Sequence, residues 1–361
     1  MLYLQSLSLT QFRNYSFREL QFDQKITAIT GPNGAGKTNL LDAIYYLCFT
    51  KSYFTGSDAA NVMHGCAGFR LEGRFQLNAA TDNITLVLRE NGKKELSKNG
   101  IAYEKFSQHI GSYPCVMVAP DDVELITGGS EIRRRFLDTL FCQLDATYLQ
   151  QLIVYNKVLQ QRNSYLKQCA RSGSRNPSLL EVLNAQLTAA GVYLYSSRRD
   201  YIPALTKQIL RFYEQIAGKP EPLDLVYESQ LHTSSFEDLL KEREEKDYLL
   251  QRSTGGIHRD ELTVRLKNEP FKTIASQGQR KSLLFAMKLA EAETLKVNKG
   301  FAPILLLDDV FEKLDAGRMH NLLDYVCRQL DAQVFLTDPH KDRIQASFEQ
   351  LGIPVQLLEP A

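Results

Sequence analysis

The residues with the clearest chemical meaning form the run GPNGAGKT, from Gly31 to Thr38. This run fits the phosphate-binding pattern G-x-x-x-x-G-K-(S/T), and it follows an apolar stretch and precedes a helical one, as that motif requires. Its glycines allow backbone N–H groups to turn towards phosphate oxygens at the start of a helix. We therefore predict that Lys37 reaches the β- and γ-phosphates of a nucleotide and that Thr38 places its hydroxyl on Mg²⁺.

A second candidate site lies far downstream, where four apolar residues (304–307) are followed by Asp308 and Asp309. A continuous apolar run predicts a buried parallel strand, and ligands bind beyond the carboxyl ends of such strands. We predict that Asp308 holds Mg²⁺, through water, and that Asp309 orients or deprotonates an attacking water. The alternative interpretation is a strand end that exposes two acids.

Between these motifs lies the run S-Q-G-Q, from Ser276 to Gln279, just before an amphipathic stretch from Leu283 to Leu295. Ser276 and Gly278 would give a backbone-accessible helix N-terminus that suits an anion. Ordinary helix capping explains the same residues when they are taken alone. The order of the three motifs along the chain is what favours a common nucleotide site.

The elements around these motifs predict an α/β fold. Residues 1–125 and 255–361 contain short runs of alternating or continuous apolar residues between turn signals and helical patterns. Strands that alternate with helices indicate an α/β sheet. Within the first segment, Asn99-Gly100 is a hairpin signal.

Residues 126–254 have a helical pattern instead. No Gly or Pro occurs from Glu131 to Gln168, and apolar residues recur at steps of three and four. A Gly- and Pro-containing break at residues 173–177 separates this stretch from a second one, which extends to about Ile216. We predict an α/β head split by an inserted antiparallel helical arm at 126–254.

Composition excludes several classes of protein. The chain has 361 residues, 43 Lys+Arg, 42 Asp+Glu and a net charge of +1, so it is not uniformly basic. With 43% apolar and 10% aromatic residues it can bury a core and is not disordered. No apolar run is long enough to span a membrane. The first residues lack the features of a signal peptide, so we expect a cytoplasmic protein, and six cysteines without a C-x-x-C pair indicate neither a disulfide framework nor zinc.

The charge is distributed unevenly. Residues 146–219 contain ten basic and three acidic residues, a surplus of seven positive charges, and Tyr and Phe are interleaved among them. A basic arm on an otherwise acidic protein suggests a DNA-facing surface, although a solvated arm is the alternative. The candidate DNA-binding residues are Lys157, Arg162, Lys167, Arg171, Arg175, Arg198 and Arg199.

This set of motifs resembles the ATP-binding-cassette ATPases and, more closely, the RecF family of bacterial DNA replication and repair proteins. The resemblance covers residue 1 to about 340, through the stretches QFRNY, GPNGAGKTNLLDAIYYL, APDDVELITGGSEIRRRFLD, GGIHRDEL, SQGQRKSLLFAMKLAE and PILLLDDVFEKLD. Chromosome-maintenance proteins share such a head, but their coiled coils are far longer than the arm predicted here.

The resemblance implies a slow, DNA-stimulated ATPase that acts as a switch, with ATP and Mg²⁺ as cofactors. It implies a protein of DNA replication, recombinational repair and the SOS response that dimerises on ATP. Such a protein binds single-stranded and duplex DNA at gaps and promotes recombinase loading with RecO and RecR.

The resemblance also implies roles for individual residues. ATP-binding residues would be Arg13, Asn14, Gly31, Pro32, Asn33, Gly34, Ala35, Gly36, Lys37, Thr38 and Asn39. The signature that contacts the nucleotide of the opposite subunit would be Ser276, Gln277, Gly278 and Gln279, with Asp315 as the D-loop aspartate and Thr337 as the switch residue. The chain departs from transport cassettes at Asp309, where those usually have Glu, so slow turnover is expected.

Two other functions are compatible with parts of the pattern. A nucleotide-binding subunit of an ABC transporter would share the order of the motifs, but the helical insertion and Asp309 disfavour it. A metabolic P-loop kinase would need an acceptor site and would not explain the run from Ser276 to Lys281.

Overall fold

The computed structural model describes residues 1–310 and 316–360. The chain forms two compact units. The head unit comprises Met1–Val123, Arg211–Pro220 and Gln277–Ala361, and the arm unit comprises Glu124–Leu210 and Glu221–Ser276.

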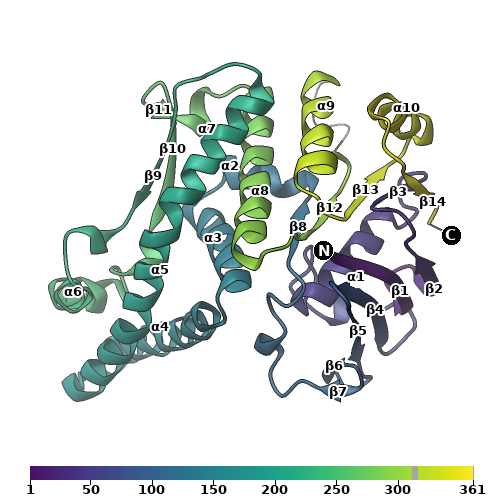
Figure 1. The fold of residues 1–361 in the computed structure, drawn as a ribbon. Coiled ribbons are helices and arrows are strands. Elements are labelled where there is room, and N and C mark those ends of the chain that lie inside the picture. The colour runs from purple at the N-terminus through teal and green to yellow at the C-terminus, as the bar shows by residue number, and fades with distance from the viewer. Residues whose placement is uncertain (311–315, 361) are drawn as a thin grey trace. The chain divides into compact units, whose positions relative to one another are not determined.

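The described part of the head unit contains two sheets (Figure 1). The first is antiparallel, in the order β2-β1-β4-β5-β6-β7, with β1 Leu2–Phe12, β2 Tyr15–Gln21, β4 Phe69–Leu77, β5 Ala80–Leu88, β6 Lys94–Lys98 and β7 Ile101–Ala102. The second is parallel, in the order β14-β3-β13-β12-β8, with β3 Ile26–Thr30, β8 Cys115–Val118, β12 Ile304–Leu307, β13 Val334–Asp338 and β14 Gln356–Leu358.

The parallel sheet brings the chemical motifs to one edge. Its strands β3, β12 and β13 are buried throughout, as the continuous apolar run of β12 predicts for that strand. Leu307 on β12 is in register with Leu336 on β13 and with Val118 on β8. Because parallel strands end at the same edge, the segments after β3, β12 and β13 lie close together.

Helix α1 (Lys37–Phe49) forms the centre of the head core. Eleven of its 13 residues are buried, which is typical of a helix that is apolar all round. Its side chains share one hydrophobic cluster with residues of both sheets, including Leu4, Phe75 and Leu306. The helix after the phosphate loop is therefore fixed on all sides.

The other helices of the head unit lie next to the parallel strands in the chain order. They include the short segment η3 Pro120–Val123 after β8, α8 Gln277–Lys299, α9 Ala316–Asp324 with a π turn at Tyr325–Gln329, and α10 Lys341–Leu351. Helix α8 packs on β8 and η3.

The arm unit is mainly helical. Its helices are α2 Glu124–Thr127, α3 Ser130–Leu144, α4 Ala146–Ser172, α5 Pro177–Ala217 (up to Leu210 in this unit), α6 Phe236–Leu250 and α7 Phe271–Ile274. Its described strands β9 Leu223–Glu228, β10 Glu261–Leu266 and β11 Glu269–Pro270 form an antiparallel sheet in the order β11-β10-β9. Gly173, with a φ of 69°, caps the end of α4, and α5 returns from the turn to complete the predicted helical hairpin.

The α/β head with an inserted helical hairpin is confirmed, and so is the hairpin at Asn99-Gly100, which joins β6 to β7. The uninterrupted helix predicted from Glu131 to Gln168 is wrong. It breaks at Asp145, whose extended backbone ends α3 and whose side chain accepts a 2.7 Å hydrogen bond from the Thr147 N–H at the start of α4. Among the described residues, no helix is both long and apolar enough to cross a membrane.

Candidate functional site

The phosphate loop lies between β3 and α1, as its motif predicts. Helix α1 begins at Lys37, directly after Gly36, whose φ of 99° is unfavourable for residues with a side chain. The Lys37 ammonium is buried and donates hydrogen bonds to the carbonyl oxygens of Gly31 (2.7 Å) and Pro32 (3.0 Å). The lysine therefore lies across the loop that would hold the phosphates.

The two predicted magnesium ligands are in direct contact. The Thr38 hydroxyl, from the first turn of α1, lies 3.0 Å from each carboxylate oxygen of Asp308, at the end of β12. The Thr337 hydroxyl on β13 donates to the same carboxylate at 2.7 Å. Residues that are 270 and 29 positions away from Asp308 are thus brought to one point.

The surroundings of Asp308 change its acidity. Its side chain is buried, and this desolvation raises the pKa of the carboxyl to about 6, with a further contribution from the nearby Asp309 charge. Hydrogen bonds from Thr337 and Thr38 act in the opposite direction. A buried carboxylate of this kind is stabilised by a cation.

Asp309 adopts an unusual backbone conformation. Its φ is 47°, in the left-handed region that non-glycine residues rarely occupy. Its N–H donates to the Thr337 hydroxyl at 2.9 Å. Strain of this kind persists where the surrounding structure holds a residue in a required orientation.

The turn between β1 and β2 packs against the phosphate loop. The Asn14 amide donates to the Ala35 carbonyl (3.3 Å) and accepts from the Asn39 amide (2.7 Å). A Cβ on Gly36 would lie 2.4 Å from the Asn14 side-chain nitrogen, so this glycine is required for the contact. The Tyr15 hydroxyl, at the end of the run QFRNY, donates to the Gly36 carbonyl at 3.1 Å.

Arg13 lies in the same turn but binds a protein group. Its guanidinium forms a 2.7 Å ion pair with Asp42 of α1, a carboxylate that is fully buried. Asp42 also accepts from the Ser52 hydroxyl at 2.7 Å. Sequence reasoning missed Asp42 and Ser52, although a lone acid among the apolar residues of α1 is a signal that could have identified Asp42.

The signature residues lie at the start of α8. The helix begins at Gln277, so Gly278 and Gln279 are in its first turn, whereas the sequence placed them before the helix. The Arg318 guanidinium of α9 donates to the Ser282 hydroxyl at 2.9 Å, and a Cβ on Gly278 would lie 2.8 Å from the same nitrogen. Asp315, the predicted D-loop residue, lies outside the described residues.

The arm candidates differ sharply in exposure. Lys157, Lys167 and Arg171 are exposed on α4. Arg175 is exposed but pairs with Glu245 at 2.6 Å, and Arg199 pairs with Asp200 at 3.1 Å.

Arg162 cannot contact DNA in this structure. Its side chain is fully buried and donates to Asp247 (2.7 Å), Ser253 (2.8 Å) and Asn184 (2.8 Å). The prediction for Arg162 is therefore wrong, because the guanidinium joins α4 to α5 and α6 inside the arm unit.

Arg198 is also buried, so its assignment to the DNA-binding surface is wrong as well. It donates to Asp138 (2.8 Å), to Asp260 (2.8 Å) and to the Tyr148 hydroxyl (3.0 Å). Asp260 belongs to the run GGIHRDEL, so this ion pair gives part of that motif a structural role. Its neighbour His258 is largely buried, and desolvation lowers the pKa of the imidazole to about 4.

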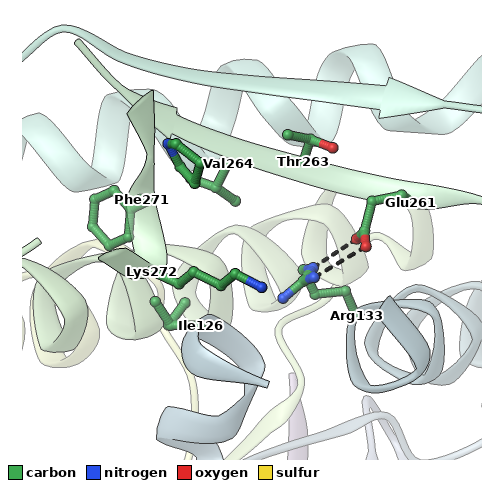
Figure 2. Close-up of a pocket in the computed structure, with 8 residues that line it drawn as sticks. Ile126, Arg133, Glu261, Thr263, Val264, Phe271 and Lys272 are labelled. Carbon is green, nitrogen blue, oxygen red and sulfur yellow. Dashed lines mark hydrogen bonds and ion pairs between the residues drawn. The ribbon is translucent and has the colours of Figure 1, made fainter. Parts of the chain in front are cut away.

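The arm unit also contains a cavity of about 180 Å³ beside β10 and α7 (Figure 2). Arg133 lies in its wall, but the guanidinium donates to Glu261 (2.7 and 3.1 Å) and to the Gly128 carbonyl (2.9 Å). Because the Arg133 guanidinium already donates to these protein groups, we assign no ligand to the cavity.

Comparisons with known proteins identify relatives along nearly the whole chain. Residues 3–356 match the model of the RecF/RecN/SMC N-terminal domain family. The chain is 41% identical over 345 residues to the DNA replication and repair protein RecF of Flavobacterium johnsoniae, covering 96% of each chain. It is 38% identical to the RecF of Cytophaga hutchinsonii, covering 96% of this chain and 92% of the relative.

Solved structures show the same fold. A structure described as the recombination mediator protein RecF with ATP, in the RecFOR pathway, superimposes with a TM-score of 0.86 at 27% identity, over 94% of this chain and 92% of that chain. An Smc head domain from Pyrococcus furiosus gives a TM-score of 0.56 at 15% identity, over 96% of this chain and 92% of that chain, a likeness of fold alone.

The match to RecF relatives along nearly the whole length outweighs the motif order that a transporter subunit would share. The chain belongs to the RecF family of DNA replication and repair proteins, within the RecF/RecN/SMC class of ATPases.

Proposed function

We propose that two copies of this protein bind ATP and Mg²⁺ between their head units and that the resulting dimer binds DNA through the arm. The observation that supports the nucleotide part most directly is the contact of Thr38 with Asp308 beside the phosphate loop. Two segments distant in sequence meet there with the residue types that a Mg²⁺-nucleotide requires.

The donor atoms at this point suit magnesium. Mg²⁺ prefers oxygen ligands and keeps several waters, and a hydroxyl and a carboxylate are what Thr38 and Asp308 offer. When bound, the ion would neutralise charge on the β- and γ-phosphates. Lys37 would exchange its two carbonyl partners for phosphate oxygens, because an ammonium binds an anion more strongly than a neutral acceptor.

The residues beyond the metal ligands suit slow hydrolysis. Asp309 would orient or deprotonate the attacking water, and Thr337 fixes its backbone from the neighbouring strand. An Asp side chain is one methylene shorter than Glu and reaches less far towards that water. We propose a slow, DNA-stimulated ATPase in which hydrolysis ends the ATP-bound state.

The signature would complete the site of the opposite copy. Ser276, Gly278 and the first N–H groups of α8 would contact the γ-phosphate held by the other phosphate loop, since a helix N-terminus favours an anion. In this arrangement ATP stabilises the dimer only while the γ-phosphate is present, which makes dimerisation a ligand-dependent population shift.

The outer face of α4 is the proposed DNA surface. Helix α4 contains no Asp or Glu in its 27 residues, and its exposed side carries Lys157, Lys167 and Arg171. Tyr148, Tyr155 and Tyr165 of the same helix are buried, so their rings are not available to stack on unpaired bases. Because single strands are bound largely by stacking and duplexes by phosphate contacts, this face favours duplex DNA.

The wider role follows from the family. The solved relative is described as a recombination mediator of the RecFOR pathway, so we propose that this protein acts with RecO and RecR in the cytoplasm. It would bind at gaps, where duplex and single-stranded DNA meet, and promote recombinase loading during replication, repair and the SOS response.

The proposal is tested by measuring self-association and binding to gapped and duplex DNA with and without ATP. We expect ATP to strengthen both and Lys37→Ala and Ser276→Ala to abolish the ATP effect. The control Lys51→Ala changes an exposed lysine of the head unit and should behave like wild type. ATP-independent dimers with unchanged DNA affinity would overturn the proposal.

A further inference from the structure

A buried group of charges lies inside the head unit. The Lys288 ammonium of α8 is 3.6 Å from Asp122, 3.8 Å from Glu291 and 3.5 Å from the Tyr53 hydroxyl. The Tyr53 hydroxyl in turn donates to Asp122. Lys288 and Glu291 are buried, and Asp122 is largely so.

These four residues come from three separate segments. Tyr53 follows α1, Asp122 lies in η3 directly after β8, and Lys288 and Glu291 lie on α8. Asp122 is also fixed to its own turn, since its carboxylate accepts from the Ala119 N–H at 2.9 Å. The cluster therefore ties α8 to the end of β8, the strand beside β12.

The contacts continue to the phosphate-loop helix. The Tyr53 N–H donates to Asp42 of α1 at 2.8 Å, and Asp42 pairs with Arg13 in the turn beside the phosphate loop. A continuous path of hydrogen bonds and ion pairs thus connects that turn, through α1, with the middle of α8. All of it lies in the head unit.

Stability alone is a weak explanation for such a cluster. Removing charges from water has a large cost, and well-packed apolar residues often stabilise a core as well or better. Buried polar groups instead impose a defined geometry, because every partner must be in place. The helix whose geometry this cluster defines begins with the signature residues at Gln277.

We propose that the Tyr53–Asp122–Lys288 cluster positions α8 so that its signature residues meet the nucleotide of the opposite copy, which makes Tyr53 and Lys288 positioning residues for the ATP-bound dimer. This inference rests on the proposed ATP-dependent dimerisation. It predicts an effect on assembly that is separate from nucleotide binding at the phosphate loop.

The test uses Tyr53→Phe, which removes one hydroxyl and keeps the ring between Tyr45 and Phe54. Lys288→Met is less useful because it leaves two buried carboxylates without a cation and is expected to unfold the head. We expect Tyr53→Phe to bind ATP as a dilute monomer within about twofold of wild type and to raise the Kd of the ATP-bound dimer about tenfold. Nucleotide titration and sedimentation measure the two quantities.

The matched control is Tyr113→Phe. Tyr113 is also buried and donates to an aspartate, Asp82, at 2.8 Å, but it packs on Phe75 of the antiparallel sheet. A purely structural role for Tyr53 predicts that both variants lower stability and leave the dimer Kd unchanged. That outcome, or an equal shift in both variants, would overturn the inference. If wild type itself fails to dimerise with ATP, the proposed function fails instead.

Discussion

At the scale of single residues, Glu291 gives the head unit a defined pH dependence. Burial raises the pKa of its carboxyl from 4.5 to about 7, despite the neighbouring Lys288. The folded protein therefore holds this proton more tightly than the unfolded chain, and the resulting stability is lost as the pH rises through about 7. We predict that, from pH 5 to pH 8, the free energy of unfolding of Glu291→Gln increases by about 2–3 kcal/mol relative to that of wild type.

Urea unfolding at several pH values measures this difference. The substitution Glu349→Gln, at an exposed position of α10, should differ from wild type by a constant amount. Asp122 and Tyr53 also face Lys288 and can add to the pH dependence. The effect of Glu291 is therefore taken from the pH dependence of Glu291→Gln relative to that of Glu349→Gln. A constant difference for Glu291→Gln would contradict the raised pKa.

The candidate phosphate and metal ligands could be selected from the sequence because such chemistry restricts residue types and spacing. Lys37, Thr38 and Asp308 are examples, since Thr38 and Asp308 meet although 270 positions separate them. Tyr53 and Lys288 were not predictable, because a buried charge is identified only by the partners that the fold supplies.

The burial of Arg162 was not predicted, although the sequence contained a signal for it. Arg162 was assigned to DNA from charge alone, yet it follows Tyr155 and Val158 on the buried face of α4 at steps of three and four residues. The helical period therefore contained the signal that this guanidinium points inward.

At the scale of elements, the ion pair of Arg162 with Asp247 holds α6 against α4. Both side chains are fully buried. Asp247→Ala leaves a buried guanidinium without its carboxylate, so we predict a loss of about 3–5 kcal/mol in the free energy of unfolding. The double variant Arg162→Met/Asp247→Leu removes both charges and should recover most of that loss, as measured by chemical denaturation.

The exposed pair Arg175–Glu245 provides the control, because it also joins the arm hairpin to α6. Alanine at both positions should change stability by about 1 kcal/mol or less, since exposed ion pairs contribute little. If Arg162→Met/Asp247→Leu loses as much stability as Asp247→Ala, apolar side chains cannot replace the buried ion pair.

The types of the elements were predicted better than their boundaries and partners. Apolar runs identified β3 and β12, because a strand buried on both faces is largely apolar. The break at Asp145 was missed, since Asp occurs within helices as well as at their ends. The strand Glu261–Leu266 lies in the small sheet of the arm unit, and strand pairing of this kind depends on contacts that no local pattern contains.

At the scale of the whole molecule, the net charge of +1 is an average over regions of different charge. The exposed cations of α4, which are Lys157, Lys167 and Arg171, have no carboxylate on the same helix. Helix α6 instead mixes both signs, with Glu237, Asp238, Glu242, Glu244 and Glu245 beside Lys241, Arg243 and Lys246. Binding to DNA depends on the local density of cations, because each phosphate contact releases condensed counterions. A protein with almost no net charge can therefore bind DNA with a steep salt dependence.

This reasoning predicts the effect of the triple variant Lys157→Gln/Lys167→Gln/Arg171→Gln. Each lost phosphate contact makes the negative slope of log K against log salt shallower by about 0.9. The magnitude of the slope for duplex DNA should therefore decrease by about 2–3, and the affinity should fall most at low salt. The triple variant Lys241→Gln/Lys246→Gln/Arg252→Gln removes the same charge from exposed positions on or next to α6, and it should leave the slope unchanged. Equal slopes in the two variants would mean that long-range charge, and not contact at α4, attracts the duplex.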